Sequence, residues 1–212
     1  MGRLSIVMAI AIASGCNDPV KPGSGGRSEQ VVSDNSAAAT ATATATVTAS
    51  HTAAAPKGPV CDKTVSGRAF PKSAPAFVDG AGAVSDRAMP AFDGHRPRWV
   101  SFFASWCGPC KEEIPRVQSF ASRLGADVEF VSIDDDLRQL TAFFGQQPEG
   151  GIKSSYWLKD GAPRTAWLAS LKMKSDPPLP EHAIFDAKGH IRCFVSGAIE
   201  DGDFGEIAAS LK

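Results

Sequence analysis

Two cysteines, Cys107 and Cys110, stand where a short apolar run gives way to a helical pattern, and this junction constrains the fold more than any other stretch. The run over residues 98–104 is rich in aromatic and apolar side chains, which is typical of a buried strand. After the cysteines, apolar residues recur at helical spacing over residues 114–124. Pro109 suits the first turn of a helix, because its missing N–H would have no partner there. We therefore expect Cys107 just outside a helix N-terminus and Cys110 in the first turn.

This placement favours thiol chemistry. The thiolate is the form that attacks disulfides, and the free N–H groups at a helix start stabilise it, so that a thiol pKa of about 8.5 can fall to about 7 or lower in such a motif. We expect an exposed Cys107 to attack a disulfide and Cys110 to resolve the resulting mixed disulfide. The alternatives are a structural disulfide and half of a zinc site. A zinc site usually needs a second ligand pair, and the sequence has no second C-x-x-C and no H-x-x-x-H.

The segment from Ser101 to Pro115, S-F-F-A-S-W-C-G-P-C-K-E-E-I-P, resembles the active-site segment of the thioredoxin superfamily. It is most similar to the membrane-tethered TlpA/ResA-like thiol-disulfide oxidoreductases. The resemblance implies an α/β thioredoxin fold, in which helices flank a central mixed β-sheet. It also implies that a redox-active Cys107–Cys110 disulfide serves in place of any cofactor or metal, with Trp106 beside it.

A second segment, residues 177–191, resembles the loop and strand that face the dithiol in this family. By that resemblance Pro180 is a cis-proline, and Leu179 and Pro180 help to form the substrate groove. Before it, residues 150–174 are interpreted as an insertion with a short helix near 164–173. Its aromatic residues could pack on the core or form a binding surface.

The stretch between these segments predicts a βαβ unit, with a strand over 128–133 and a helix over 137–145. The acidic run Asp134, Asp135 and Asp136 lies between them, and we interpret it as a solvated helix cap in preference to a metal site. Residues 191–196 predict a further strand, and residues 203–211 predict a terminal helix.

Two residues depart from the family pattern. Ser101 stands where cytosolic thioredoxins have a buried Asp, and Gly108 replaces the acidic residue found between the cysteines of ResA. A serine cannot act as a base near neutral pH. Proton transfer from Cys110 would then need water or a carboxylate such as Glu112 or Glu113, both interpreted as solvated helix residues.

The N-terminal part of the chain indicates export. Residues 1–16 have one basic residue, an apolar run and small residues directly before Cys16, which resembles the signal of a bacterial lipoprotein with Cys16 as the lipidated residue. The alternative is an ordinary signal peptide cleaved nearby. Residues 17–60 are rich in Ala, Thr, Gly and Ser and predict a disordered spacer, which leaves residues 61–212 as the thioredoxin-like domain.

The remaining cysteines, Cys61 and Cys193, are either a second, structural disulfide or two unpaired thiols. His182 follows Pro180 closely, and with Cys107 and Cys110 it could complete a copper or zinc site; a hydrogen-bonded strand histidine is the commoner role.

The formal net charge of −1 provides no basic patch for nucleic-acid binding. We therefore expect client proteins with disulfides or cysteines as partners, together with a membrane-bound electron donor. The expected function is reduction of client disulfides, as in cytochrome c maturation, at the periplasmic side of a bacterial membrane to which the N-terminal lipid anchors the protein. A disulfide-forming oxidant, a metal-carrying module and a redox-silent binding protein acting through residues 150–174 are the alternatives.

Overall fold

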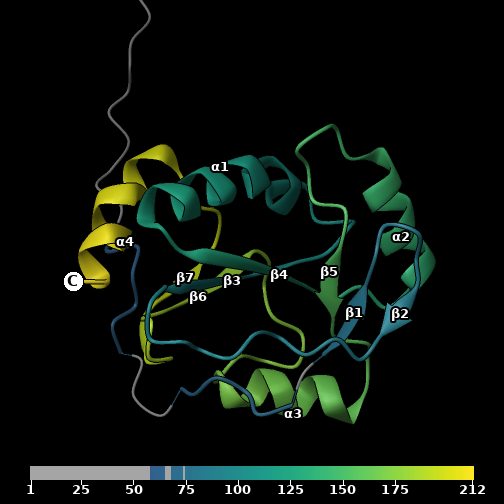
Figure 1. The fold of residues 1–212 in the computed structure, drawn as a ribbon, viewed down its shortest axis with the longest axis horizontal. Coiled ribbons are helices and arrows are strands. Elements are labelled where there is room, and N and C mark those ends of the chain that lie inside the picture. The colour runs from purple at the N-terminus through teal and green to yellow at the C-terminus, as the bar shows by residue number, and fades with distance from the viewer. Residues whose placement is uncertain (1–57, 65–67, 74) are drawn as a thin grey trace, which may run out of the picture. The chain divides into compact units, whose positions relative to one another are not determined.

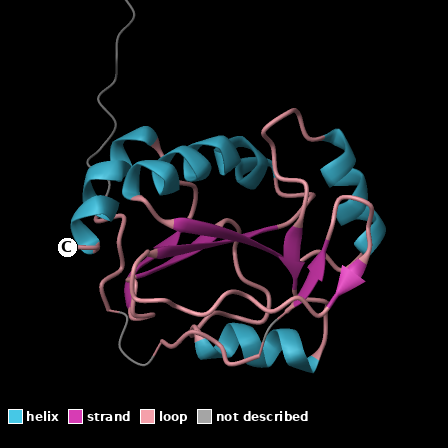
Figure 2. Cartoon of the chain, in the orientation of Figure 1, coloured by secondary structure: helices cyan, strands magenta, loops and turns pink. Residues whose placement is uncertain are grey.

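The structure is a computed structural model that describes residues 58–64, 68–73 and 75–212. The signal region, Cys16 and almost all of the predicted spacer lie outside these residues. A seven-stranded mixed sheet in the order β2-β1-β5-β4-β3-β6-β7 forms the centre, with α1 and α3 on opposite sides of it (Figures 1 and 2). The strands are β1 (Ala76–Val78), β2 (Val84–Ser85), β3 (Arg98–Phe103), β4 (Asp127–Ser132), β5 (Ser155–Trp157), β6 (Glu181–Phe185) and β7 (Ile191–Ser196). The helices are α1 (Gly108–Leu124), α2 (Leu137–Gln146), α3 (Ala162–Ser170), the 3₁₀ turn η1 (Asp201–Asp203) and α4 (Phe204–Ser210).

Strand β3 lies inside the sheet, parallel to β4 and antiparallel to β6. All six of its residues are buried, because helices cover both faces of the sheet at this strand. Phe102 packs against Trp167 of α3 on one face, with ring centroids 5.8 Å apart, and Phe103 packs against Phe143 of α2 on the other, at 5.6 Å. This packing fixes the end of β3 from which the chain continues to Cys107.

Helix α1 packs on the sheet through a stripe of apolar residues that includes Ile114, Val117 and Phe120. It ends at Gly125, whose positive φ of 62° is a left-handed conformation that glycine adopts without steric cost. The predicted helix after the cysteines is therefore present, and it begins at Gly108.

The segment predicted as an insertion supplies a strand that the sequence analysis missed. Strand β5 pairs with β4 in parallel and with β1 antiparallel, so it lies within the sheet. The helix expected near residues 164–173 is α3, which begins two residues earlier, at Ala162, and ends at Ser170. Tyr156, Trp157 and Trp167 are buried, so these aromatic residues belong to the core.

A disulfide joins the start of the domain to its last strand. Cys61 and Cys193 are both buried, with their sulfur atoms 1.95 Å apart. Next to it, Asp62 and Phe194 exchange backbone hydrogen bonds of 2.8 and 3.2 Å. The Glu206 carboxylate accepts the backbone N–H groups of Val60 and Cys61, both at 3.0 Å, and these bonds hold the pKa of Glu206 below its usual value. The N-terminal segment is thus attached both to β7 and to α4.

None of the helices within residues 58–64, 68–73 and 75–212 has the length and hydropathy needed to cross a bilayer.

Replacing both Cys61 and Cys193 by alanine should lower the free energy of unfolding by about 2–5 kcal/mol, because the bond closes a long loop in the unfolded chain. The two cysteines are 132 residues apart. Urea unfolding of the oxidised double variant and the oxidised wild-type protein measures this difference. Equal stabilities would show that the disulfide does not constrain the unfolded chain.

Candidate active site

Cys107 is the N-cap residue of α1, and Pro109 lies in the first turn, as the sequence predicts. The backbone N–H of Cys110 donates to Cys107 Sγ, with a nitrogen–sulfur distance of 3.2 Å. Cys107 also forms a disulfide with Cys110, whose sulfur lies 1.96 Å away. In the reduced protein the same N–H group and the positive end of the helix dipole would stabilise a Cys107 thiolate.

The exposure of these residues differs from the expectation of an exposed Cys107. Cys107 is 5% exposed and Cys110 is 1% exposed, whereas the neighbouring Trp106 is 60% exposed. Cys107 faces its own helix in the disulfide, because its sulfur is bonded to Cys110 and accepts a first-turn N–H. Both cysteines are therefore buried in the disulfide form, and the prediction of an exposed Cys107 is wrong for this state.

The Leu179–Pro180 peptide bond is cis. Its position relative to the dithiol follows from sheet register, since Glu181 of β6 pairs with Phe102 of β3. Residues 179 and 180 therefore lie at the end of β3 from which the Cys107 loop emerges. Two parts of the chain, the segment with Trp106 and the dithiol and the segment with Pro180, therefore lie at the same end of the sheet.

The carboxyl group of Glu181 follows the cis-proline and is 6% exposed. Burial raises its pKa, an effect that a hydrogen bond from Ser196 and the charges of Arg68 and Lys174 oppose. A negative charge at this position is therefore less favourable than at the surface.

The three acidic residues before α2 do not all cap this helix from the solvent. Asp136 does cap α2, by accepting the N–H of Arg138 at 2.9 Å. Asp134, however, has no exposed surface, so its interpretation as solvated is wrong. Burial of this carboxylate depends on partners that lie on the strand and loop around it.

One of those partners, Ser105, belongs to the segment that leads into the cysteines, and the other, Ser132, ends β4. Asp134 accepts the backbone N–H of Ser105 at 3.0 Å and its hydroxyl at 2.6 Å, and the Ser132 hydroxyl at 2.7 Å. One buried carboxylate thus fixes the residue directly before Trp106. The sequence offered one indication that Asp134 would lie near the cysteines. It follows β4, and Cys107 follows β3, and the two strands are parallel, so both residues lie at the same edge of the sheet.

Glu113 and His182 form a buried pair that the sequence analysis did not predict. Glu112 is exposed as expected, but Glu113 is 2% exposed, which contradicts its interpretation as a solvated helix residue. His182 is completely buried in β6, and its Nε2 lies 3.2 Å from Glu113 Oε1. In the described part of the chain, no group of three or more His, Cys, Asp or Glu side chains is arranged to hold a metal ion. The indole N–H of Trp99 donates to His182 Nδ1 at 3.2 Å, so His182 is a hydrogen-bonded strand histidine.

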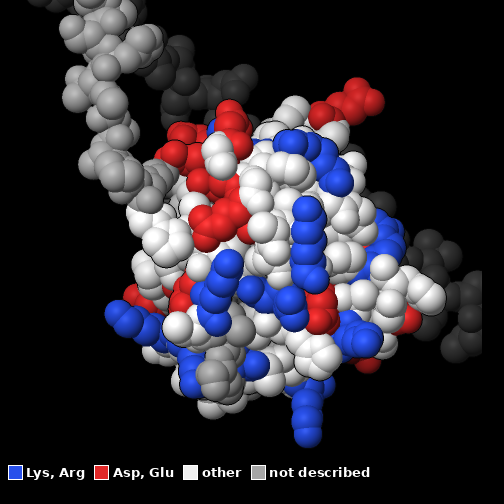
Figure 3. All heavy atoms as spheres, turned by 90° about the vertical axis from the view of Figure 1, so that its left-hand side faces the viewer, with Lys and Arg blue, Asp and Glu red and all other residues white. Residues whose placement is uncertain are grey.

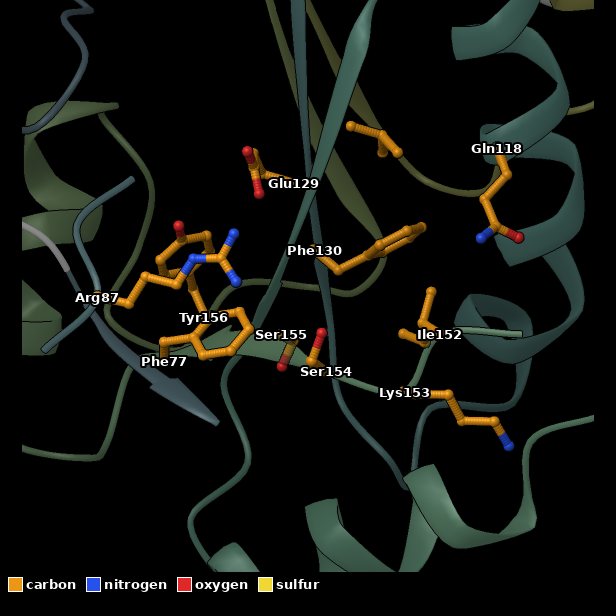
Figure 4. A pocket seen from close by; sticks show the side chains of 11 residues that line it. Phe77, Arg87, Gln118, Glu129, Phe130, Ile152, Lys153, Ser154, Ser155 and Tyr156 are labelled. Atoms are coloured by element: carbon orange, nitrogen blue, oxygen red, sulfur yellow. The ribbon is translucent and has the colours of Figure 1, made fainter. Parts of the chain in front are cut away.

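Hollows lie both between α1 and α2 and against the sheet. One, of about 500 Å³, is lined in part by Trp106, Lys111 and Gln139, next to the dithiol. The other, of about 270 Å³, includes Glu129 of β4 and Tyr156 of β5 in its lining, and neither cysteine contributes to it (Figure 4). Burial raises the pKa of Glu129 there, with Arg98 and Arg87 opposing the shift. Only the first hollow adjoins the dithiol.

Acidic and basic side chains both occur on the face shown in Figure 3, where Asp and Glu gather in one area at the upper left and Lys and Arg lie to the right of it and below it. This distribution agrees with the formal net charge of −1. This face is therefore not one continuous basic surface.

The segment that carries both cysteines is similar to thioredoxins. The thioredoxin family model matches residues 91–143, which include both cysteines. The thioredoxin of Mycobacterium bovis is 32% identical over 92 residues, which are 43% of this chain and 74% of that protein. The thioredoxin of Borreliella burgdorferi is 35% identical over 49 residues, 23% of this chain and 42% of that protein. The chain thus spans less than two thirds of the first curated relatives that it matches.

Among solved structures, the thioredoxin domain of a thiol-disulfide oxidoreductase from Bacteroides vulgatus aligns with a TM-score of 0.50 and 17% identity. The alignment covers 69% of this chain and 97% of that domain. This likeness, together with the family match, confirms the predicted fold class.

Replacing Asp134 by asparagine should lower the free energy of unfolding by about 1–3 kcal/mol, because the amide nitrogen cannot accept the hydrogen bonds that the lost oxygen accepted. Urea unfolding measures the change. The matched control is Asp127→Asn, which removes an exposed ion pair with Arg96 and should cost no more than about 1 kcal/mol. Equal losses in the two variants would contradict a structural role for the buried carboxylate.

Proposed function

Because the chain belongs to the thioredoxin family, we propose that it is a thiol-disulfide oxidoreductase that reduces disulfides of client proteins outside the cytoplasm. The observation that carries this proposal is the position of Cys107 as the N-cap of α1, where its sulfur accepts the N–H of Cys110. This geometry stabilises the negative charge that develops on Cys107 whenever it acts as nucleophile or leaving group.

The reaction begins with the Cys107 thiolate, which attacks one sulfur of a client disulfide. The client S–S bond breaks, one client cysteine leaves as a thiolate, and a mixed disulfide joins Cys107 to the client. Cys110 then loses its proton and attacks Cys107, which forms the Cys107–Cys110 disulfide and releases the second client thiolate. Two electrons pass from the dithiol to the client, and both released client thiolates take protons from water.

Client binding uses the surface around the dithiol. Trp106 offers an exposed aromatic face beside Cys107, with 60% of the residue accessible. Leu179 and Pro180 lie at the same end of β3 and would border an extended client segment. The hollow lined by Trp106 and Lys111 extends this surface towards α2.

The direction of electron flow is proposed from the residues between the cysteines. Gly108 and Pro109 form the same pair as in thioredoxin, a reductant at about −270 mV, whereas the strong oxidant DsbA has a potential of about −120 mV. Reduction is therefore proposed over disulfide formation. The dithiol would then be reduced again by a membrane-bound electron donor, and the resemblance to TlpA/ResA-like proteins implies clients in cytochrome c maturation.

The proposed location rests on the N-terminal sequence and on the second disulfide. Residues 1–16 form the proposed lipoprotein signal, and Cys16 would carry the lipid that attaches the protein to a bacterial membrane on its periplasmic side. The Cys61–Cys193 disulfide supports an oxidising compartment, because structural disulfides are rare in the cytosol.

The wild-type protein should accelerate the reduction of insulin by dithiothreitol, and Cys107→Ser should abolish this acceleration because the nucleophile is lost. Cys110→Ser should retain the first step and accumulate a mixed disulfide with insulin, visible by non-reducing electrophoresis.

The Cys61→Ala/Cys193→Ala double variant is the control for loss of a disulfide outside the site, and it should keep the activity below its unfolding temperature. Activity that survives Cys107→Ser would contradict the proposed function. A dithiol potential near about −120 mV, measured against glutathione, would contradict the reducing direction alone.

A further inference from the structure

The hollow between α1 and α2 has a lining whose chemistry the reaction steps above do not use. It measures about 500 Å³, with Trp106 and Lys111 on one wall and Gln139 and Gln146 of α2 on the other. Trp106 is 60% exposed, and among the described residues only one other large apolar side chain, Val84, is exposed to a similar extent. Tryptophan is enriched among the residues that contribute most to binding at protein interfaces.

Helix α2 contributes one continuous face to this hollow. Gln139, Ala142, Phe143 and Gln146 all line it, and their spacing of three, four and seven residues places them along one side of the helix. Phe143 is 5% exposed and attaches this face to the core. Ala142 lies between the two glutamines, and its small side chain leaves room there. Each carboxamide offers both donors and an acceptor, so the glutamines can pair with the C=O and N–H groups of an extended chain.

Lys111 is the one ionisable side chain among the described residues that line the hollow. It is exposed, and no hydrogen bond or ion pair reaches its ammonium group from any residue in the described part of the chain. The Lys111 backbone N–H donates to the Cys107 carbonyl at 3.2 Å, so Lys111 lies one helical turn after Cys107. A group that enters the hollow beside Cys107 therefore meets a single positive charge.

The neighbouring charged residues leave that charge unmatched. Glu112 follows Lys111 directly but does not line the hollow, since consecutive residues of a helix point in different directions. Asp136 and Arg138, at the start of α2, pair with each other at 2.8 Å. Lys153 donates to the Phe144 carbonyl at 3.3 Å, near the other end of α2, and also lies outside the lining.

We propose that this hollow binds the client residues that flank the reacting cystine, and that Lys111 selects clients with acidic side chains at those positions. The client chain lies extended along α2, where Gln139 and Gln146 pair with its peptide groups and Lys111 pairs with a client carboxylate. Trp106 covers the client chain from the side of the dithiol. The inference rests on the proposed function, because it names the client chemistry of the same site.

Two peptides that differ only in charge test this selection. They have the sequences D-A-C-A-D and K-A-C-A-K, are blocked at both ends, and carry thionitrobenzoate on the cysteine through a disulfide. The Cys107 thiolate attacks the peptide sulfur, the bond to thionitrobenzoate breaks, and the coloured thionitrobenzoate thiolate leaves with the electron pair. The rate constant of this release from the reduced protein should be about 5- to 10-fold higher for the acidic peptide at low ionic strength, and salt should reduce the difference.

The role of Lys111 is tested by the ratio of these two rate constants within each variant, because the ratio cancels any change in the reactivity of Cys107 itself. Lys111→Gln should bring the ratio close to one, and Lys111→Glu should reverse the preference. The matched control is Lys188→Gln, which removes an exposed positive charge from the turn between β6 and β7 and should keep the wild-type ratio.

The place of the client chain is tested by filling the hollow. Ala142 is exposed on α2, and leucine is a strong helix former, so Ala142→Leu should fold. It should slow the reaction of both peptides several-fold relative to the mixed disulfide of mercaptoethanol and thionitrobenzoate, which has no flanking residues to place in the hollow.

Equal rate constants for the two peptides in the wild-type protein, or a preference that persists in Lys111→Gln, would overturn the role of Lys111. An unchanged ratio of peptide to mercaptoethanol rates in Ala142→Leu would overturn the position of the client chain. Rates no faster than those of glutathione for all three probes would contradict the proposed function instead, so the failures are distinguishable.

Discussion

The hydrogen bond from the Cys110 N–H to Cys107 Sγ is the interaction on which the chemistry of this protein depends. It exists because β3 ends at Phe103 and α1 begins at Gly108, which leaves Cys107 to cap the helix with its sulfur. A sulfur in this position faces unpaired N–H groups and the positive end of a helix dipole. The buried strand β3 and helix α1, which packs on it, hold that geometry in place, so packing of the core positions Cys107.

Buried carboxylates support the dithiol from two directions. Asp134, at the end of β4, fixes Ser105 and hence the loop that carries Trp106 and Cys107. Glu113, three residues after Cys110 in α1, accepts the backbone N–H of Ile199 through one oxygen. Burying a carboxyl group without hydrogen bonds is costly, and each of these two has them. The first fixes the loop before the outer cysteine, and the second joins α1 to the backbone at Ile199.

Much of this arrangement could be predicted from the sequence. The strand before Cys107, the helix after it and the strand over residues 191–196 have strong periodicity, and the structure agrees with all three. Strand β5 was missed because three residues are too few to show alternation, and its place between β1 and β4 is a property of the assembled sheet. Asp134 and Glu113 were misinterpreted because a charged residue is usually solvated, and their burial depends on partners far away in the chain, such as Ser105 and His182.

The rate of Cys107 alkylation by iodoacetamide, followed over pH in the reduced protein, tests the central claim most directly. The account predicts that this rate reaches its half-maximal value near about pH 7, well below the pKa of about 8.5 of a free cysteine, because the helix start stabilises the thiolate. Cys110→Ser keeps the single nucleophile for this measurement and retains the N–H at position 110. A profile that coincides with that of free cysteine would contradict the account.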